Sequence, residues 1–150
     1  MVGMVPIAGS DREEFELMAI KHFSELDPAF VPQKSWREQY FQNILNTPQC
    51  FLRWIVGDGE RAGFILFGLE KHRFLPRTTG AIYELYVRPE FRRRGLAKAC
   101  AEEAIRELWT HSPSKIQLEI VDGHPAAVAL WRSLGFQKVT ERFVLARETP

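Results

Sequence analysis

Apolar residues in the first third of the chain recur at the spacing of amphipathic helices. One stripe runs through residues 15–26, and Ser10 with Glu13 forms a predicted capping box at its start. A second stripe spans residues 36–45. The loop 27–32 between them contains two prolines, which interrupt a helix. The pattern therefore predicts two consecutive helices.

Strand-like runs surround these helices. A short apolar run at 5–8 precedes them, and three longer runs follow at 51–56, 62–69 and 81–87. The first two of these longer runs are joined by an Asp-Gly turn, which is typical of a β-hairpin. The segment 70–79 is polar and basic. We expect it to form an exposed hairpin tip, and a second turn that borders the substrate side is the alternative. Together the three runs predict an antiparallel meander.

The last third of the chain contains apolar residues at both helical and strand-like spacing. It predicts a helix at 96–108, a strand with one polar face at 116–120, a helix at 127–134, and final strands at 136–139 and 143–146. The expected order is β-α-α-β-β-β-α-β-α-β-β. This is a mixed α/β (α+β) architecture with about seven strands and four helices.

Composition narrows the function classes. A chain of 150 residues suits one domain, so we expect residues 1–150 to form a single unit. The 20 Lys+Arg nearly balance the 19 Asp+Glu, which argues against a general nucleic-acid or membrane binder. No signal peptide or membrane-length apolar run is evident, so a cytoplasmic location is the default expectation. The two cysteines, Cys50 and Cys100, indicate neither a disulfide scaffold nor a metal site.

A basic loop joins the third strand of the meander to the following helix. It contains Arg88 and Arg92–Arg94, and it ends in Gly95, Leu96 and Ala97. The first turn of a helix has unpaired N–H groups and a partial positive charge, so a phosphate group is stabilised there. The loop therefore predicts an anion-binding site. A solvated basic loop or a nucleic-acid patch is the alternative.

Two motifs resemble signatures of the GCN5-related N-acetyltransferases (the GNAT family). Arg92, Gly95 and Ala97 match the pyrophosphate-binding signature, in which Gln or Arg is followed at fixed spacing by Gly and by Gly or Ala. A second run keeps Ala127 and the pair Gly135-Phe136 in register. It departs from the family pattern by having His124 in place of Asn and Trp131 in place of Tyr.

The resemblance covers essentially the whole chain and implies a GNAT fold. It also implies acetyl-coenzyme A (acetyl-CoA) as donor, with no metal, and a primary amine of a small molecule or peptide as acceptor in a ternary complex. A homodimer is possible because dimers are common in the family. The implied donor-binding residues are Leu85, Tyr86, Val87, Arg92, Arg93, Arg94, Gly95, Leu96, Ala97, His124, Ala127 and Trp131. A backbone N–H near Tyr86 or Val87, where two strands splay apart, is implied to stabilise the oxyanion.

Acetyl transfer requires a base, because an ammonium ion is not nucleophilic. Glu84, flanked by apolar residues in a strand, is the leading candidate, and Glu119 on the neighbouring strand is the second. The non-catalytic alternatives are that Glu84 attracts a cationic substrate or pairs with an arginine, and that Glu119 faces solvent. His22, at the edge of the first helical stripe, is expected to be a core or boundary residue.

The tyrosine that donates a proton in the family is Trp131 here, and an indole N–H is not an acid near neutral pH. Tyr83, Tyr86 and His124 are local substitutes. A thiol with a pKa of about 8.5 can also leave unprotonated, so we expect no dedicated acid. A non-catalytic acetyl-CoA-binding sensor or scaffold is the alternative function. The acceptor stays open among polyamines, amino acids, aminoglycosides, and protein N-termini or lysines.

Overall fold

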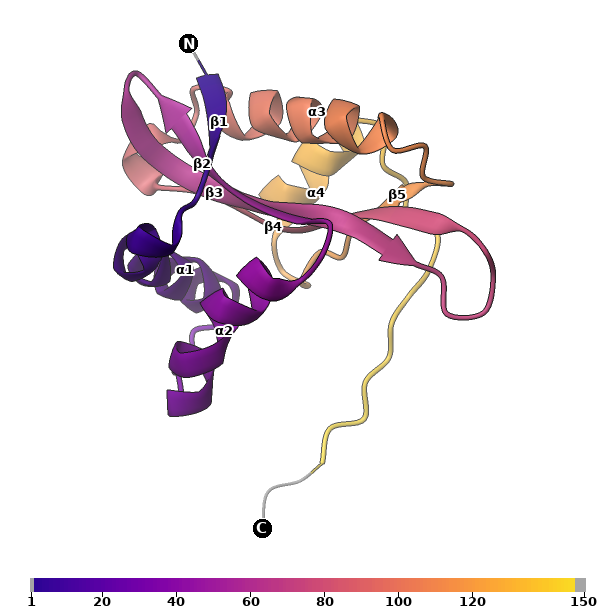
Figure 1. Cartoon of the computed structure of the whole chain (residues 1–150), viewed down its shortest axis with the longest axis horizontal. Coiled ribbons are helices and arrows are strands. Elements are labelled where there is room, and N and C mark those ends of the chain that lie inside the picture. Colours follow the sequence, from indigo (N-terminus) through magenta and orange to yellow (C-terminus); the bar gives the residue numbers. More distant parts are fainter. Residues whose placement is uncertain (1, 148–150) are drawn as a thin grey trace.

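A computed structural model describes residues 2–147. Five strands and four α-helices are arranged in it as shown in Figure 1. The strands are β1 (Val2–Pro6), β2 (Cys50–Gly57), β3 (Glu60–Lys71), β4 (Thr78–Val87) and β5 (Ile116–Gln117). The helices are α1 (Arg12–Leu26), α2 (Lys34–Asn46), α3 (Leu96–Trp109) and α4 (Pro125–Ser133), with short 3-10 turns at Gly9–Asp11 and Pro89–Phe91.

The strands form one sheet in the order β1-β2-β3-β4-β5. Neighbouring strands are antiparallel except β4 and β5, which are parallel and are connected through α3. Figure 1 shows α3 and α4 on one face of the sheet and α1 and α2 on the other. This is the mixed α/β architecture that the sequence predicts.

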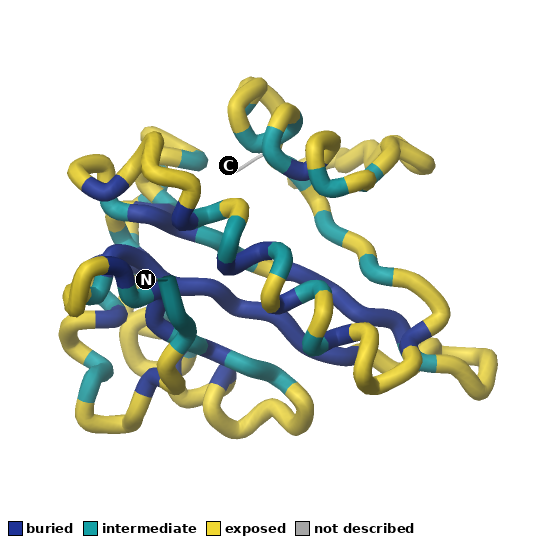
Figure 2. Tube along the Cα trace, turned by 90° about the horizontal axis from the view of Figure 1, so that it is seen from above, coloured by how far each residue is buried: buried dark blue, intermediate teal, exposed yellow. Residues whose placement is uncertain are grey.

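Each face of the sheet buries its own core. Alternate residues of β3 point to opposite faces, so Ile65 and Phe67 pack beneath α3 while Phe64 and Leu66 pack against α1 and α2. Figure 2 shows buried positions along the central strands and exposed positions in the β3–β4 loop and after α4. Because both faces are covered over the middle of the sheet, β3 is buried at eight consecutive positions, from residue 62 to residue 69.

The expected strand count of about seven is wrong for the described residues, where the sheet has five. The predicted strands 136–139 and 143–146 form no ladder, and their apolar side chains lie exposed: Val139 is 84% exposed and Leu145 100%. The strand predicted at 116–120 pairs with β4 only through Ile116 and Gln117. Alternation alone does not make a strand, because a strand also needs a partner for its backbone.

The first strand and the first helix start differ from prediction as well. The ladder covers Val2–Pro6 rather than 5–8, although the Ile7 N–H still donates to the Leu52 carbonyl at 3.1 Å. The capping box of Ser10 and Glu13 is also wrong. A 3-10 turn occupies that position, and the carboxylate of Asp11 reaches back to accept from the Ala8 N–H at 3.0 Å.

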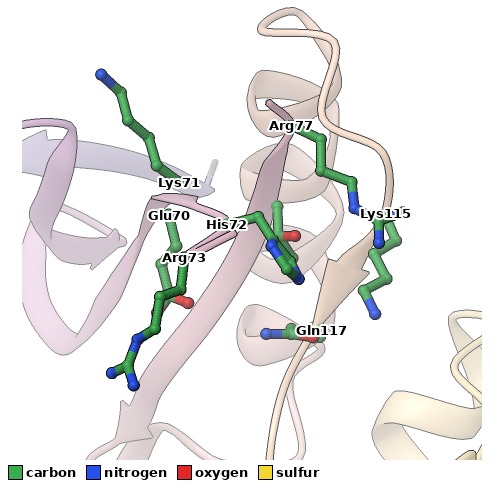
Figure 3. Close-up of a pocket in the computed structure, with 8 residues that line it drawn as sticks. Glu70, Lys71, His72, Arg73, Arg77, Lys115 and Gln117 are labelled. Carbon is green, nitrogen blue, oxygen red and sulfur yellow. The ribbon is translucent and has the colours of Figure 1, made fainter. Parts of the chain in front are cut away.

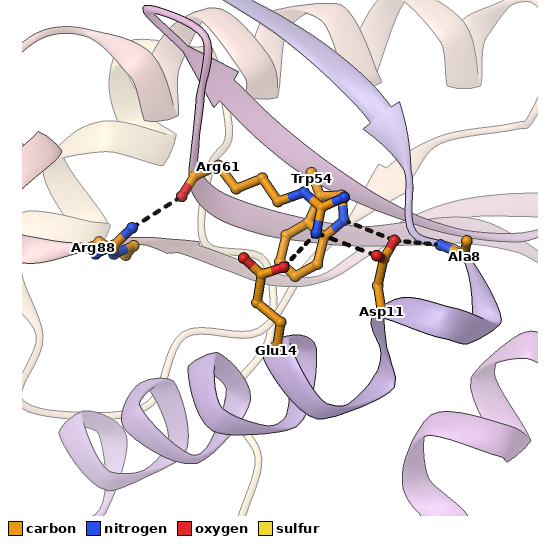
Figure 4. A network of polar contacts seen from close by, with 6 residues as sticks. All are labelled: Ala8, Asp11, Glu14, Trp54, Arg61 and Arg88. Atoms are coloured by element: carbon orange, nitrogen blue, oxygen red, sulfur yellow. Dashed lines mark hydrogen bonds and ion pairs between the residues drawn. The ribbon is translucent and has the colours of Figure 1, made fainter.

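Asp11 is the centre of a polar network that joins α1 to the sheet (Figure 4). Its carboxylate accepts from the Trp54 indole at 3.3 Å and from Arg61 at 3.2 Å, and Arg61 also pairs with Glu14. The Ala8 N–H and then the Trp54 indole hold the pKa of Asp11 below its usual value. The backbone carbonyl of Arg61 in turn accepts from the Arg88 guanidinium at 3.3 Å, so the network extends to the end of β4.

Within residues 2–147, no helix combines the length and the apolar character needed to cross a bilayer. Over the same residues, no group of three or more His, Cys, Asp or Glu side chains is placed to hold a metal ion.

Candidate active site

The strands β4 and β5 separate soon after they meet. They pair only through Gly80 with Ile116 and Ala81 with Gln117. Beyond these pairs, the half of β4 from Ile82 to Val87 has no β5 partner among the described residues. The family resemblance implies such a separation, and it leaves this edge of β4 without a strand partner among the described residues.

A β-bulge shapes β4 at the same place. The register with β3 shifts so that Leu66 is opposite Glu84 and Phe67 is opposite Ile82, which leaves Tyr83 as an extra residue. A bulge bends a strand and re-aims its side chains. Here it lies where β4 leaves β5, and it helps to direct Glu84 toward α1.

The basic loop after β4 lines a cavity at the start of α3. Arg93 and Gly95 both have left-handed backbones, with φ of 64° and 76°, and no side chain caps the first turn of α3. The turn therefore keeps N–H groups available for an anion. The cavity is lined by Val87, Phe91, Arg92, Arg93, Gly95, Leu96, Ala97, Lys98, Ala126 and Leu130. The cationic side chains, the free N–H groups and the apolar wall fit a diphosphate with an attached organic chain.

Arg92 lines this cavity and is also anchored by contacts within the protein. Its Nε donates to the Val87 carbonyl at 2.7 Å, and its Nη2 contacts both carboxylate oxygens of Glu25 at 2.9 and 2.8 Å. The guanidinium also lies 5.5 Å from the Tyr86 ring centre. Arg92 thus ties the loop to β4 and α1, which leaves Arg93 and Lys98 as the cavity cations without an ion pair among the described residues.

The other implied donor-binding residues do not line this cavity. Leu85, Tyr86, Arg94, His124 and Ala127 lie outside its lining, and Arg94 is 3.8 Å from Asp58. Trp131 is 7% exposed and packs in the core edge-to-face against Phe136, with ring centres 5.5 Å apart. Its buried position supports a packing role for the indole.

Gly95 offers a direct test of the cavity. No atom lies within 4 Å of where a Cβ would be, so space is no obstacle, but the φ of +76° strains any L side chain. We expect Gly95→Val to destabilise the loop conformation by about 1–2 kcal/mol and to weaken acetyl-CoA binding about tenfold, measured by calorimetry. Gly59→Val is the matched control, because Gly59 has a φ of +78° and equally open surroundings in the β2–β3 turn. Equal losses of affinity in both variants would contradict this assignment.

Glu84 forms a pair with a residue that the sequence reasoning did not select. Its Oε2 lies 2.5 Å from the Nε2 of His22, which projects from α1. The His22 side chain is 9% exposed and that of Glu84 22%, so the pair is mostly but not fully enclosed. Phe23, Phe64 and Tyr86 surround the imidazole, with ring centres 5.1 to 5.6 Å away. The one signal in the sequence is a histidine among the apolar positions of α1.

Glu119 is placed differently. It lies beyond the end of β5, and its two carboxylate oxygens both accept from the Nη1 of Arg142, at 2.9 and 3.0 Å. Its side chain is 77% exposed. Glu84 is therefore the carboxylate held within the fold, and Glu119 is a solvated one.

Two tyrosines, Tyr83 and Tyr86, lie near Glu84 in the sequence of β4. The Tyr83 hydroxyl donates to Glu70 at 2.6 Å, and burial followed by that bond raises the pKa of Tyr83. Burial also raises the pKa of Tyr86, whose hydroxyl is buried with no hydrogen-bond partner among residues 2–147. Both hydroxyls therefore stay protonated at neutral pH.

Comparison with known proteins gives consistent results. The sequence model of the "Acetyltransferase (GNAT) family" matches residues 16–136. The [ribosomal protein bS18]-alanine N-acetyltransferase of Escherichia coli (strain K12) is 29% identical over 134 residues, covering 89% of this chain and 82% of the relative. The crystal structure of ribosomal-protein-alanine N-acetyltransferase from Brucella melitensis biovar Abortus 2308 superposes with a TM-score of 0.78 at 18% identity, covering 98% of this chain and 99% of that one. The aminoglycoside N-acetyltransferase AAC(6')-Iy in complex with CoA gives 0.72 at 17% identity, with 99% and 95% covered.

Proposed function

We propose that this chain acetylates the amino terminus of a protein. It belongs to the GNAT family of acetyltransferases and is an acetyl-CoA-dependent N-acetyltransferase. Relatives named for acetylating a ribosomal-protein alanine match most of its length. These relatives are named as enzymes, and the chain shares its fold with solved acetyltransferases. Both findings favour an enzyme over a non-catalytic acetyl-CoA-binding module. At 29% identity the ribosomal protein itself is not carried over as the substrate.

The donor fits the cavity at the start of α3. The N–H groups of the first turn, together with Arg93 and Lys98, would hold the diphosphate of acetyl-CoA. Arg92 would keep the loop in place through Glu25 and the Val87 carbonyl. When bound, acetyl-CoA supplies an acetyl group activated as a thioester. The uncovered edge of β4 offers backbone N–H groups near Tyr86 and Val87 for the carbonyl oxygen.

The observation that carries the proposal is the His22–Glu84 pair beside the splayed strands. Glu84 is close enough to solvent to meet an incoming amine and is held in one orientation by His22. We assign Glu84 as the base that removes the proton from the amine, directly or through one water. His22 is a positioning residue, since it acts on the reaction through Glu84.

No dedicated acid is required at the other end of the reaction. Trp131 is buried among apolar residues and its indole does not ionise near neutral pH. A thiol pKa of about 8.5 allows departure as thiolate at modest cost. The protonated hydroxyl of Tyr86, unpartnered among residues 2–147, is available to stabilise that charge by donating a hydrogen bond.

Acetylation of matched peptides tests the proposal. The full chain with acetyl-CoA should acetylate a short peptide that has a free amino terminus, with thiol release of equal stoichiometry and a mass increase on the terminal residue. A peptide of the same sequence with a blocked amino terminus and a free lysine is the control. Acetylation of the lysine peptide alone, or of an aminoglycoside but neither peptide, would contradict a protein N-terminus as acceptor.

A further inference from the structure

A second, basic pocket lies at the opposite end of β4 from the donor cavity. The β3–β4 hairpin and the start of β5 form it together. It is lined by Glu70, Lys71, His72, Arg73, Arg77, Thr79, Lys115 and Gln117. Figure 3 shows His72, Arg77, Lys115 and Gln117 around the opening, whereas Lys71 points away from it. The role proposed for the donor cavity leaves this pocket unexplained.

The hairpin fixes the tautomer of His72. Its Nδ1 accepts hydrogen bonds from the backbone N–H groups of Phe74 and Leu75, at 3.1 and 3.0 Å. The backbone N–H of His72 donates to the Arg77 carbonyl at 2.8 Å, which closes the turn. Because Nδ1 is an acceptor, the proton of the neutral ring is on Nε2. The His72 ring therefore offers one further donor.

The cations of this pocket are not neutralised by the protein. Across residues 2–147, no carboxylate lies within ion-pair distance of Lys71, Arg73, Arg77 or Lys115. Glu70, the one carboxylate in the lining, accepts from the Tyr83 hydroxyl at 2.6 Å. In a chain with a net charge of only +1, this is a local concentration of donors and positive charge that favours an anion.

Alternation along the strands places the pocket on the same face of the sheet as Glu84. Leu69 and Ile116 pack in the core beneath α3, so their neighbours Glu70 and Gln117 project from the opposite face. Glu84 projects from that face too, because its carboxylate contacts α1. The proposed base and the basic pocket therefore lie on the same face of the sheet.

The separation between them selects the kind of acceptor. Thr79 in the pocket is opposite Glu70 and Glu84 is opposite Leu66, so the two are four β3 positions apart once the bulge is taken into account. At ~3.3 Å per residue this separation is about 13 Å. In a free amino acid the carboxylate is within a few bonds of the amine and cannot reach. An extended peptide covers the distance in about four residues.

We propose that the basic pocket binds an acidic side chain of the acceptor peptide, about four residues from the amine that is acetylated. The inference rests on the proposed N-terminal acetyltransferase function and adds a substrate class to it. Arg77 and Lys115 supply the charge, and His72 and Gln117 supply neutral hydrogen-bond donors. A nucleic-acid phosphate is the competing ligand, but the pocket lies on the face that carries the acceptor base, and the charge of the whole chain is nearly balanced.

The test compares three peptides with free amino termini that differ only at one position, about four residues from the amine. The position holds glutamate, glutamine or lysine. With the full chain we expect kcat/KM to be about tenfold higher for the glutamate peptide than for the glutamine peptide, mainly through KM, and lowest for the lysine peptide. The preference should weaken as salt is raised, because the pocket is exposed. In the double variant Arg77→Gln/Lys115→Gln the glutamate and glutamine peptides should become equal.

Arg106→Gln is the matched control, because Arg106 is exposed on α3, on the other face of the sheet. It should keep the wild-type preference. Equal use of glutamate and glutamine peptides by the wild-type chain would overturn this inference and leave the proposed function intact. If no peptide is acetylated, the proposed function fails. Binding of a fluorescent glutamate peptide to the wild type and to the double variant then tests the pocket independently of catalysis. Tighter binding of a uridine oligonucleotide than of that peptide, lost in the double variant, would assign the pocket to nucleic acid instead.

Discussion

Glu84→Gln is expected to lower kcat/KM for acetyl transfer about a hundredfold or more, without loss of acetyl-CoA binding. Glutamine keeps the shape of the side chain and can still contact His22, but it cannot accept the proton of the incoming ammonium group. The deficit should shrink as pH rises past the pKa of the acceptor α-amine, about 8, because the free amine then no longer needs a base. Steady-state kinetics across this pH range measure both effects.

Glu119→Gln is the matched control for this prediction. Glu119 is a solvated carboxylate paired with Arg142, so its substitution should change kcat/KM by less than about threefold. His22→Asn should give an intermediate loss and a shifted pH profile, since it alters the environment of Glu84 and not the base itself. A large loss of kcat/KM in Glu119→Gln together with a small loss in Glu84→Gln would contradict this assignment and identify Glu119 as the base.

Gly63→Ala is expected to destabilise the fold by about 3 kcal/mol and to lower the melting temperature by about 10 °C. A Cβ at Gly63 would lie 1.9 Å from the carbonyl oxygen of Tyr86 and 2.9 Å from the Cα of Val87. These are backbone atoms of β4 and cannot rotate away. The strand end that leads into the donor cavity would have to move, so acetyl-CoA affinity should fall together with stability.

The control for Gly63 is another strand glycine. Gly3 in β1 has nothing within 4 Å of the place that a Cβ would occupy, so Gly3→Ala should stay within about 0.5 kcal/mol of the wild type. Thermal unfolding with and without acetyl-CoA separates the two variants. A Gly63→Ala protein with unchanged melting temperature and unchanged affinity would contradict the close approach of β3 to β4.

Local periodicity was sufficient to predict the helices and the meander. The stripes at 15–26 and 36–45 lie in α1 and α2, and the run 62–69 is the buried centre of β3. These elements bury one or both faces, so their apolar residues are spaced as their buried positions are. The apolar run at 143–146 has the same appearance as the run at 62–69, but its side chains are exposed and its backbone pairs with no strand in the described part of the chain. Pairing between strands depends on the tertiary structure, and the spacing of apolar residues within one segment does not reveal it.

The site was predicted in part for a related reason. The loop at 92–97 was identified because its residues are adjacent, and Glu84 because a carboxylate in an apolar strand is unusual. His22 was missed because it lies 62 positions from Glu84, and the Glu25 partner of Arg92 lies 67 positions away. Contacts over such separations depend on how α1 packs on the sheet. The bulge at Tyr83, which arises from the pairing of β3 with β4, has no clear signal in the sequence either.

A crystal structure of the chain with an unreactive acetyl-CoA analogue and a peptide acceptor would test the central claim most directly. We expect the peptide amine about 3 Å from a Glu84 carboxylate oxygen, or joined to it through one water, with the diphosphate against the first turn of α3. An amine placed beside Glu119 and away from Glu84, or a diphosphate bound elsewhere, would contradict this claim.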